Sequence, residues 1–363
     1  MRKSITGQLD YTERAFLQDA NDALRGDIVR GLIEIVTNAD DAYVRSETDG
    51  PIEIEVEHLG ESDHGGAQIR VFDKAGGMTH EEMKIKFGQL GTRHSGLEEG
   101  QPVRGLNGRG FKDVASFGSV GMESLRNGKW ARIRIDGINY KIDLEPTESE
   151  DEIRERLRLS PSESGSTVTI DVNGPTHMRN LFERLSCVAE LRHITDERNV
   201  TMAEFGSRKR DVGRLYYEPP PRTQVVHKTV DIPEYPEASA ELVVFEMNDA
   251  QPDPAGAETH NGILISGRRG VYMNTLFTVE QKPNSRYLMG HLRCAYIDDL
   301  IRQFDDREAS GQSPLKENPM RLTRRSRDGL VDEHPFTKNL KKLFSTELLP
   351  LVESLEKRHE GER

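Results

Sequence analysis

The alternation of apolar and polar residues is most regular between Gly31 and Tyr43. Within GLIEIVTNADDAY, the polar residues Glu34, Asn38 and Asp41 recur at i, i+4 and i+7 among apolar ones. This spacing predicts a helix with one polar side and a remainder fit for a core. A carboxylate there can take a proton from water, and an amide one turn on can hold hydrated Mg²⁺. A solvent-facing stripe on an ordinary amphipathic helix is the alternative.

The first part of the chain is expected to alternate helices and strands. The predicted elements are helices over 4–25 and 26–46, a half-buried strand from Ile52, a second strand over 68–73, and a helix over 79–90. Thr79 is placed as the N-cap of the last helix, with Glu82 as its capping-box partner.

The second predicted strand runs directly into the sequence KAGGM. Gly76 and Gly77 allow a tight turn with positive φ there, which leaves the Asp73 carboxylate facing a cavity. A loop with glycines is common, so this motif alone is a weak indication of a site.

Residues 88–110 are dense in glycine. Such a stretch is either a disordered linker or a loop that closes over a ligand. Its second half favours the loop, because its last glycines precede FKDVASF, which is typical of a helix start. Free backbone N–H groups and the positive end of the helix dipole would face an anion there. Arg109 and Lys112 add positive charge beside it.

Further strands are predicted in SVGMESLR, KWARIRIDG, NYKIDLE and STVTIDV, with a turn at Asn127–Gly128. Residues 147–165 are expected to be a charged surface excursion, and residues 176–195 a helix packing back on the sheet. The pattern indicates an α+β sandwich, with one layer of sheet and helices on one face. Three consecutive prolines at 219–221 mark a boundary region.

A second domain is predicted to follow the prolines. Its strand-like stretches are VVHKTVDI, ELVVFEMN and NGILISGRRGVYMN. A polar loop carrying Lys282 comes next, then LRCAYIDDLIRQF and an irregular region over 309–335. A terminal helix over about 336–358 carries an apolar stripe, which would pack on this domain or on a partner helix.

Composition limits the classes of partner. At 363 residues the chain has room for two domains, and its net charge of −12 argues against indiscriminate binding of nucleic acid or anionic lipid. A local basic patch, RLTRRSR, occupies 321–327. Cys187 and Cys294 lack metal-ligand spacing and suggest no disulfide framework, which favours a reducing compartment. Neither a membrane span nor a signal peptide is expected, so the location predicted is cytoplasmic.

Four motifs stand in a fixed order along the chain. They are Glu34-x3-Asn38-x2-Asp41, Asp73-x2-Gly76-Gly77-Met78, Gly105-x2-Gly108-x-Gly110, and the sequence GSTVTI at 165–170. The series resembles the GHKL (Bergerat-fold) ATPases, which include DNA gyrase, MutL mismatch-repair proteins, heat-shock chaperones of the HSP90 type, MORC proteins and sensor histidine kinases. The resemblance covers about residues 20–175 and, more loosely, the second domain.

The resemblance implies a Bergerat-type α/β sandwich ATP-binding domain over 1–222, with a lid at 88–110. A transducer-like α/β domain would follow over 223–363. Histidine kinases usually lack the glutamate and carry a phospho-accepting histidine upstream, whereas the residues before the helix predicted over 26–46 contain no histidine. The gyrase, mismatch-repair, MORC and chaperone branch therefore fits better than a kinase.

Residue roles follow from the resemblance. Glu34 would be the general base, Asn38 the Mg²⁺ ligand, and Asp73 the acceptor for the adenine amino group. The implied nucleotide-binding positions are Asn38, Asp41, Asp73, Gly77, Met78, Thr92, Arg93, Gly105, Gly108, Arg109, Gly110, Phe111, Lys112 and Ser166. Lys282 would be the basic residue of the second domain that reaches the γ-phosphate, with Arg268 and Arg269 as the next candidates. Each of the three is at least as well explained as an ordinary surface cation.

The sequence departs from the family pattern at two places. Lys74 and Ala75 stand where many members have Asn and Gly, which puts a metal-side contact of position 74 in question. Ser166 stands where many members have Thr, and the hydroxyl near Asp73 and the adenine is kept.

The implied activity is Mg²⁺-dependent ATP hydrolysis, in which lid closure drives dimerisation or a conformational change that acts on DNA or a protein partner. Phage defence or DNA maintenance would suit a MORC-like ATPase, by analogy only. An ATP-gated binding module or chaperone-like scaffold without turnover is the alternative. A third interpretation makes the chain the N-terminal part of a longer effector.

Overall fold

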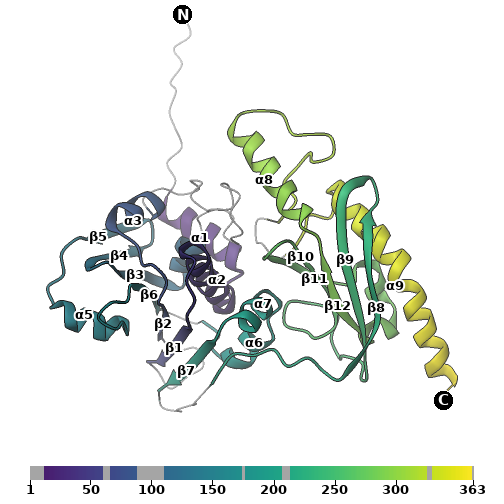
Figure 1. Ribbon diagram of the computed structural model, residues 1–363, viewed down its shortest axis with the longest axis horizontal. Coiled ribbons are helices and arrows are strands. Elements are labelled where there is room, and N and C mark those ends of the chain that lie inside the picture. Colours follow the sequence, from purple (N-terminus) through teal and green to yellow (C-terminus); the bar gives the residue numbers. More distant parts are fainter. Residues whose placement is uncertain are drawn as a thin grey trace, which may run out of the picture.

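The chain folds into two mixed sheets, each with its own helices and core (Figure 1). The α+β class expected from the sequence is thereby confirmed. The computed structural model describes residues 12–59, 66–87, 110–173, 176–206, 213–324 and 329–361.

The first sheet has the strand order β5-β4-β3-β6-β2-β1-β7. Its strands are β1 (Ile52–His58), β2 (Ala67–Asp73), β3 (Gly118–Arg126), β4 (Lys129–Asp136), β5 (Asn139–Asp143), β6 (Gly165–Val172) and β7 (Val200–Phe205). Neighbouring strands are antiparallel except β1 and β7, which pair in parallel. The edge strand β7 was not predicted from the sequence. The turn at Asn127–Gly128 joins β3 and β4 as predicted, with positive φ at both residues.

One face of this sheet carries the main core. The helices that pack there are α1 (Glu13–Leu24), α2 (Ile28–Ser46), α4 (Gly110–Asp113) with the 3₁₀ turn η1 (Val114–Phe117), α6 (Leu181–Cys187) and α7 (Ala189–Glu197). Helix α2 matches the prediction, because Asp27 caps its first turn and Glu47 ends it in a left-handed conformation. The single helix predicted over 176–195 is instead two, since Val188 is extended between them.

The charged excursion predicted over 147–165 is wrong in part. It contains helix α5 (Glu150–Leu157), which begins with a capping box at Ser149. Ile153 and Leu157 pack on Leu125 and Trp130 in a small separate core. Side chains alternate between the faces of a strand, so Leu125 points away from the main core that Val120 enters. Helices therefore cover part of both faces, not one face only.

Helix α3 (His80–Phe87) packs against β4 and β5. Its predicted capping box is confirmed: the Thr79 N–H donates to Glu82 Oε2 over 2.8 Å, and the Glu82 N–H donates to Thr79 Oγ1 over 3.3 Å.

The second sheet has the order β11-β10-β12-β9-β8. Its elements are β8 (Arg222–Ile232), β9 (Tyr235–Met247), β10 (Gly262–Ser266), β11 (Val271–Thr275), η2 (Phe277–Gln281), η3 (Pro283–Tyr287), β12 (Leu288–Arg293), α8 (Tyr296–Ala309) and α9 (Pro335–Gly361). The apolar stripe of α9 packs on this sheet. The stripe is thus used within the chain. Strand β8 begins one residue before the boundary expected at 222/223.

Two surface features bear on partners. In the basic patch, Arg321 pairs with Asp305 and Glu308, and Arg324 pairs with Asp332, so acidic neighbours offset these charges. Within the ranges described, no helix has the length and apolar character needed to cross a bilayer.

Candidate functional site

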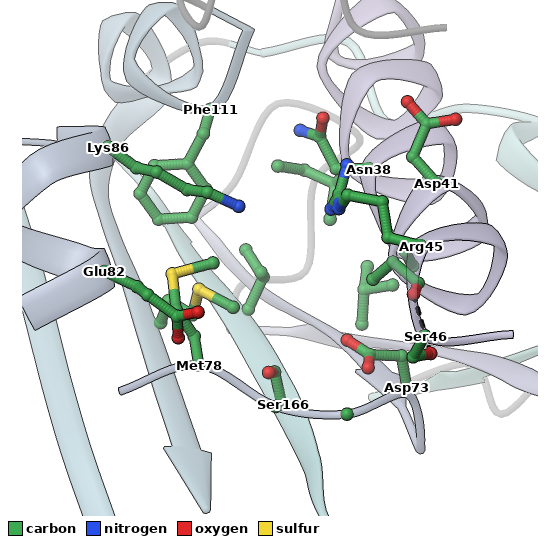
Figure 2. A pocket seen from close by; sticks show the side chains of 18 of the residues that line it. Asn38, Asp41, Arg45, Ser46, Asp73, Met78, Glu82, Lys86, Phe111 and Ser166 are labelled. Atoms are coloured by element: carbon green, nitrogen blue, oxygen red, sulfur yellow. Dashed lines mark hydrogen bonds between the residues drawn. The ribbon is translucent and has the colours of Figure 1, made fainter. Parts of the chain in front are cut away.

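A pocket of about 330 Å³ opens between α2, the end of β2, α3 and β6 (Figure 2). Residues from all four sequence motifs line it: Glu34, Asn38 and Asp41; Asp73, Gly77 and Met78; Gly110; and Ser166. Phe111, which follows the third motif, lines it as well. These motifs are far apart in the sequence. Their convergence on one cavity is what the sequence pattern predicted for a site.

The floor of the pocket is formed where β2 meets β6. Asp73 and Ser166 face each other directly in the antiparallel register, which brings the two predicted residues together. Ser166 Oγ lies 3.1 Å from Ser124 Oγ, which accepts a hydrogen bond of 2.7 Å from the Met78 N–H. Ser124 was not predicted. It ties the floor to the glycine loop.

Gly77 shows why the loop after β2 needs glycine. Its φ is +67°, and a Cβ there would lie 2.7 Å from the Leu125 carbonyl oxygen. Any side chain at this position would push β3 away from the loop, which would deform the pocket. The predicted positive φ is confirmed at Gly77 but not at Gly76.

The Asp73 carboxyl group is strongly perturbed by its burial. Burial raises its pKa to about 7, although the Ala75 N–H and the charge of Arg45 oppose that rise. The Ala75 N–H donates to Asp73 Oδ1 over 3.0 Å. The carboxyl group lines the pocket, so its oxygen atoms can accept a hydrogen bond from the N–H donor of a ligand.

Helix α2 forms one wall. Glu34 and Asn38 are partly exposed to the pocket, whereas Asp41 is buried. The polar stripe continues one turn further, to Arg45, which also lines the pocket. This residue was missed in the sequence, although its spacing of four from Asp41 extends the pattern.

Three cations line the pocket: Arg45 from α2, Lys86 from α3 and Arg126 from β3. Glu82 binds Arg126 at 2.7 and 2.8 Å. Burial, together with the charge of Arg45, lowers the pKa of Lys86 to about 8. Figure 2 shows the Lys86 amine pointing into the cavity. The lining also holds four acidic residues, Glu34, Asp41, Asp73 and Glu82, so the cations give local positive charge that an anionic group of a ligand can contact. No sequence motif marked these three residues.

Part of the lining is apolar. The rings of Phe87 and Phe111 are tilted by 39° with centroids 4.6 Å apart, and Met78 and Met122 also line the pocket. The cavity therefore combines apolar side chains, a buried acid and three cations, which suits a ligand with a flat ring and an anionic tail.

The remaining predicted residues are placed as follows. Thr92, Arg93, Gly105, Gly108 and Arg109, and with them the lid up to 109, lie outside the described residues. Lys112 is buried and does not line the pocket. Helix α4 has only four residues, so its dipole is much smaller than that of the helix start predicted there.

The cations predicted in the second domain do not line the pocket either. Lys282 is exposed after η2. Arg268 binds Asp299 at 3.0 Å, and Arg269 binds Asp40 at 3.1 Å.

No cluster of three or more His, Cys, Asp or Glu side chains with metal-binding geometry is found in the described part of the chain. Asn38 nevertheless offers its amide oxygen to the pocket, one turn of α2 from Glu34. Mg²⁺ typically uses one or two protein ligands together with water and substrate phosphates, so Asn38 fits the role of its protein ligand.

No protein-family model matches the chain, and no curated protein matches it. The candidate site therefore rests on its own geometry and on the motifs that compose it.

Proposed function

We propose that the pocket binds ATP together with Mg²⁺ and that the chain hydrolyses the γ-phosphate, in the manner of the GHKL ATPases. The observation that carries this proposal is that residues of four separated motifs line a single cavity, which also contains the buried acid Asp73 and three cations. A cavity of about 330 Å³ is at the lower end of the size range of small-molecule sites, about 300–1,000 Å³. The lid would add further walls.

The adenine ring would lie on the floor of the pocket. The Asp73 carboxylate would accept a hydrogen bond from the adenine amino group, with the Ser166 hydroxyl beside it. Met78 would contact the ring face, because its backbone is held by Ser124. This arrangement predicts a preference for adenine over guanine, which presents a carbonyl oxygen where adenine presents an amino group.

The triphosphate would extend along the wall formed by α2. Glu34 would take the proton of the attacking water as general base. Asn38 would hold Mg²⁺, which supplies charge neutralisation on the phosphate oxygens when bound. Lys86 of α3 would meet the negative charge from the opposite wall, and Arg45 would meet it from α2 itself.

The same proposal includes conformational changes that accompany ATP binding. Closure of the lid over ATP would favour a homodimer and change the position of the second domain, which would act on DNA or a protein partner. Lys282 would reach the γ-phosphate only in that closed arrangement, since it is exposed and away from the pocket here.

Nucleotide preference tests the proposal. At pH 8 the Asp73 carboxylate is mostly ionised, so 1 mM ATP or ADP with Mg²⁺ should raise the midpoint of thermal unfolding by about 2 to 6 °C. The same concentration of GTP should give almost no increase. Equal increases with ATP, GTP and CTP would contradict an adenine site, and no increase with any nucleotide would contradict the proposal itself.

Replacing Lys86 with methionine tests whether this cation contributes to phosphate binding. The substitution keeps the length of the side chain but removes its charge, so the affinity for ATP at pH 7 should fall by about 10-fold. Binding of adenosine, which has no phosphate, should stay unchanged. The effect should shrink at pH 9, because the wild-type amine, with a pKa of about 8, is then largely neutral. Calorimetric titration measures all three values.

Lys84 provides the matched control, since it lies on the same helix but is exposed and does not line the pocket. Lys84→Met should bind ATP like the wild type. An equal loss of ATP affinity in both variants would mean that the effect comes from the general charge of α3 and not from a contact in the pocket.

A further inference from the structure

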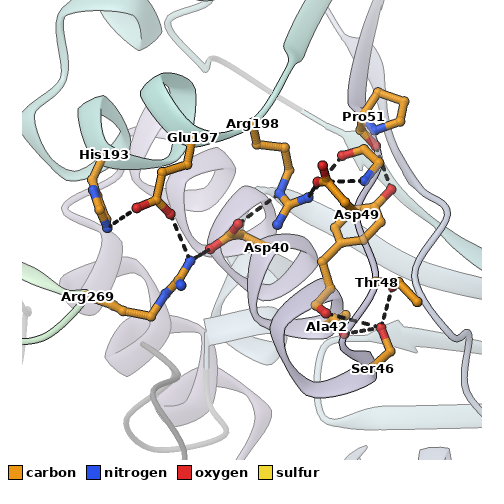
Figure 3. Close-up of polar contacts among 12 residues, drawn as sticks. Asp40, Ala42, Ser46, Thr48, Asp49, Pro51, His193, Glu197, Arg198 and Arg269 are labelled. Carbon is orange, nitrogen blue, oxygen red and sulfur yellow. Dashed lines mark hydrogen bonds and ion pairs between the residues drawn. The ribbon is translucent and has the colours of Figure 1, made fainter.

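The turn between β10 and β11 carries an arginine from the second sheet to helix α2 of the first. Arg269 Nη2 lies 3.1 Å from Asp40 Oδ2 and 3.2 Å from Glu197 Oε2 (Figure 3). Asp40 belongs to α2, and Glu197 ends α7. A side chain of the second domain is therefore bonded directly to the helix that forms the pocket wall.

The position of this turn is fixed by the second domain itself. The Arg268 N–H donates to Asp298 Oδ2 over 2.8 Å, and its guanidinium binds Asp299 at 3.0 Å. Both acids lie in the first turn of α8. A Cβ on Gly267 would meet Asp298 at 2.0 Å, so the turn lies directly against α8. Arg268 therefore anchors the turn to α8, whereas the adjacent Arg269 extends to the first domain.

Asp40 is fully buried and has a second guanidinium partner. Arg198 Nε donates to Asp40 Oδ1 over 2.9 Å. Loss of either guanidinium would leave Asp40 with the other and would weaken the compensation of a buried charge, which destabilises the local arrangement. The position of α2 therefore depends on both arginines.

The same network reaches the floor of the pocket. The Arg198 guanidinium lies 4.2 Å from the centre of the Tyr43 ring. The Tyr43 hydroxyl donates to the Pro51 carbonyl and accepts from the Lys74 N–H, each over 2.7 Å. Lys74 follows Asp73 directly. A continuous series of contacts therefore joins Arg269 to the backbone beside the buried acid.

On helix α2, the residue that contacts the second domain is a close neighbour of residues that line the pocket. Asp40 stands between Asn38 and Asp41, both of which line the pocket. Successive residues on a helix are rotated by about 100°, so a small rotation of α2 moves the Asp40 contact and the pocket residues together.

A separate contact holds the two domains together. The Ala189 N–H donates to the Ala257 carbonyl over 2.7 Å, and Arg184 binds Glu258 at 2.8 Å. Loss of Arg269 would thus leave the domains attached at this loop. What it would remove is the restraint on α2.

We propose that Arg269 is a positioning residue: through Asp40 it holds α2 in the arrangement that shapes the pocket, so that nucleotide binding and the position of the second domain influence each other. The coupling between nucleotide binding and the position of the second domain rests on the function proposed above, whereas the restraint on α2 does not. Arg269 contacts no substrate in this account.

Amide hydrogen exchange of the ligand-free protein tests the restraint. In Arg269→Gln, peptides from 28–46 and 67–78 should exchange at least about 5-fold faster, because the openings that expose them become less costly. Peptides from 129–143, in β4 and β5, should be unchanged. Arg293→Gln removes an exposed arginine of the same domain and should change none of these peptides. Unchanged exchange over 28–46 in Arg269→Gln would overturn the proposal, as would an equal acceleration throughout the first domain.

Affinity for MgATP tests the coupling. Arg269→Gln should bind about 10-fold more weakly, because the competent arrangement of α2 is less populated. Arg269→Lys keeps the charge and should recover the affinity to within about 3-fold. Equal binding by wild type and Arg269→Gln would overturn the coupling. If the wild type binds no ATP, the proposed function fails, and the exchange experiment still decides whether Arg269 restrains α2.

Discussion

Replacing Glu34 with alanine is expected to lower ATP turnover by about 10²- to 10⁴-fold while ATP binding stays within about 3-fold of the wild type. The reason is that a general base acts on the attacking water in the transition state and contributes little to ground-state binding. Glu34→Gln keeps the size of the side chain and should lose as much turnover. Phosphate release, measured over a range of protein concentrations, gives the rates.

The matched control for this experiment is Glu81→Ala, because Glu81 is an exposed helical glutamate outside the pocket. It should hydrolyse ATP like the wild type. Wild-type turnover in Glu34→Ala with ATP still bound would remove Glu34 from the role of base. Tight binding without turnover in the wild type itself would favour the nucleotide-gated binding module.

The second large effect is expected at Asp73. Asp73→Asn should weaken ATP binding by about 100-fold, since an amide replaces the charged acceptor for the adenine amino group and must bury its own N–H donors. The ligand-free variant should nevertheless be more stable than the wild type at pH 8, by on the order of 2 kcal/mol, because it no longer buries a carboxylate. Loss of binding with a gain in stability separates a functional residue from a structural one.

The pH dependence of this stability difference follows from the raised pKa. The folded carboxyl group holds its proton up to a pKa of about 7, whereas the unfolded one has an ordinary value of 3.8. Stability contributed by the protonated group is complete below the unfolded value and is lost as pH rises through 7. The advantage of Asp73→Asn should therefore grow between pH 4 and 7 and then level off.

Denaturant unfolding at pH 5, 6, 7 and 8 measures this profile, with the exposed Asp136 changed to Asn as control. Asp136→Asn should show no such growth. A stability difference that is independent of pH would contradict a raised pKa at Asp73.

Local patterns predicted the elements that shape the site. The i, i+4, i+7 stripe placed Glu34, Asn38 and Asp41 on α2, and the capping box placed the start of α3, because both depend on residues within two turns of each other. The direct pairing of Asp73 with Ser166 also agrees with the motif order, since each residue stands at an end of a clearly alternating strand.

Features that depend on distant partners were not predicted. Strand β7 pairs in parallel with β1, far away in the sequence, and no local pattern encodes that pairing. The role of α5 was missed because only Ile153 and Leu157 interrupt its charged surface. Lys86 and Arg126 enter the pocket from α3 and β3, and Arg269 reaches α2 from the other domain, so only the tertiary structure could bring these cations to their partners.

The most direct test of the central claim is a crystal structure of the Glu34→Ala protein with MgATP. The account predicts the adenine amino group within hydrogen-bond distance of Asp73, the ring against Met78, and the triphosphate along α2 between Asn38 and Lys86. Nucleotide bound elsewhere on the chain, or bound here with its phosphates at Asp73, would contradict it.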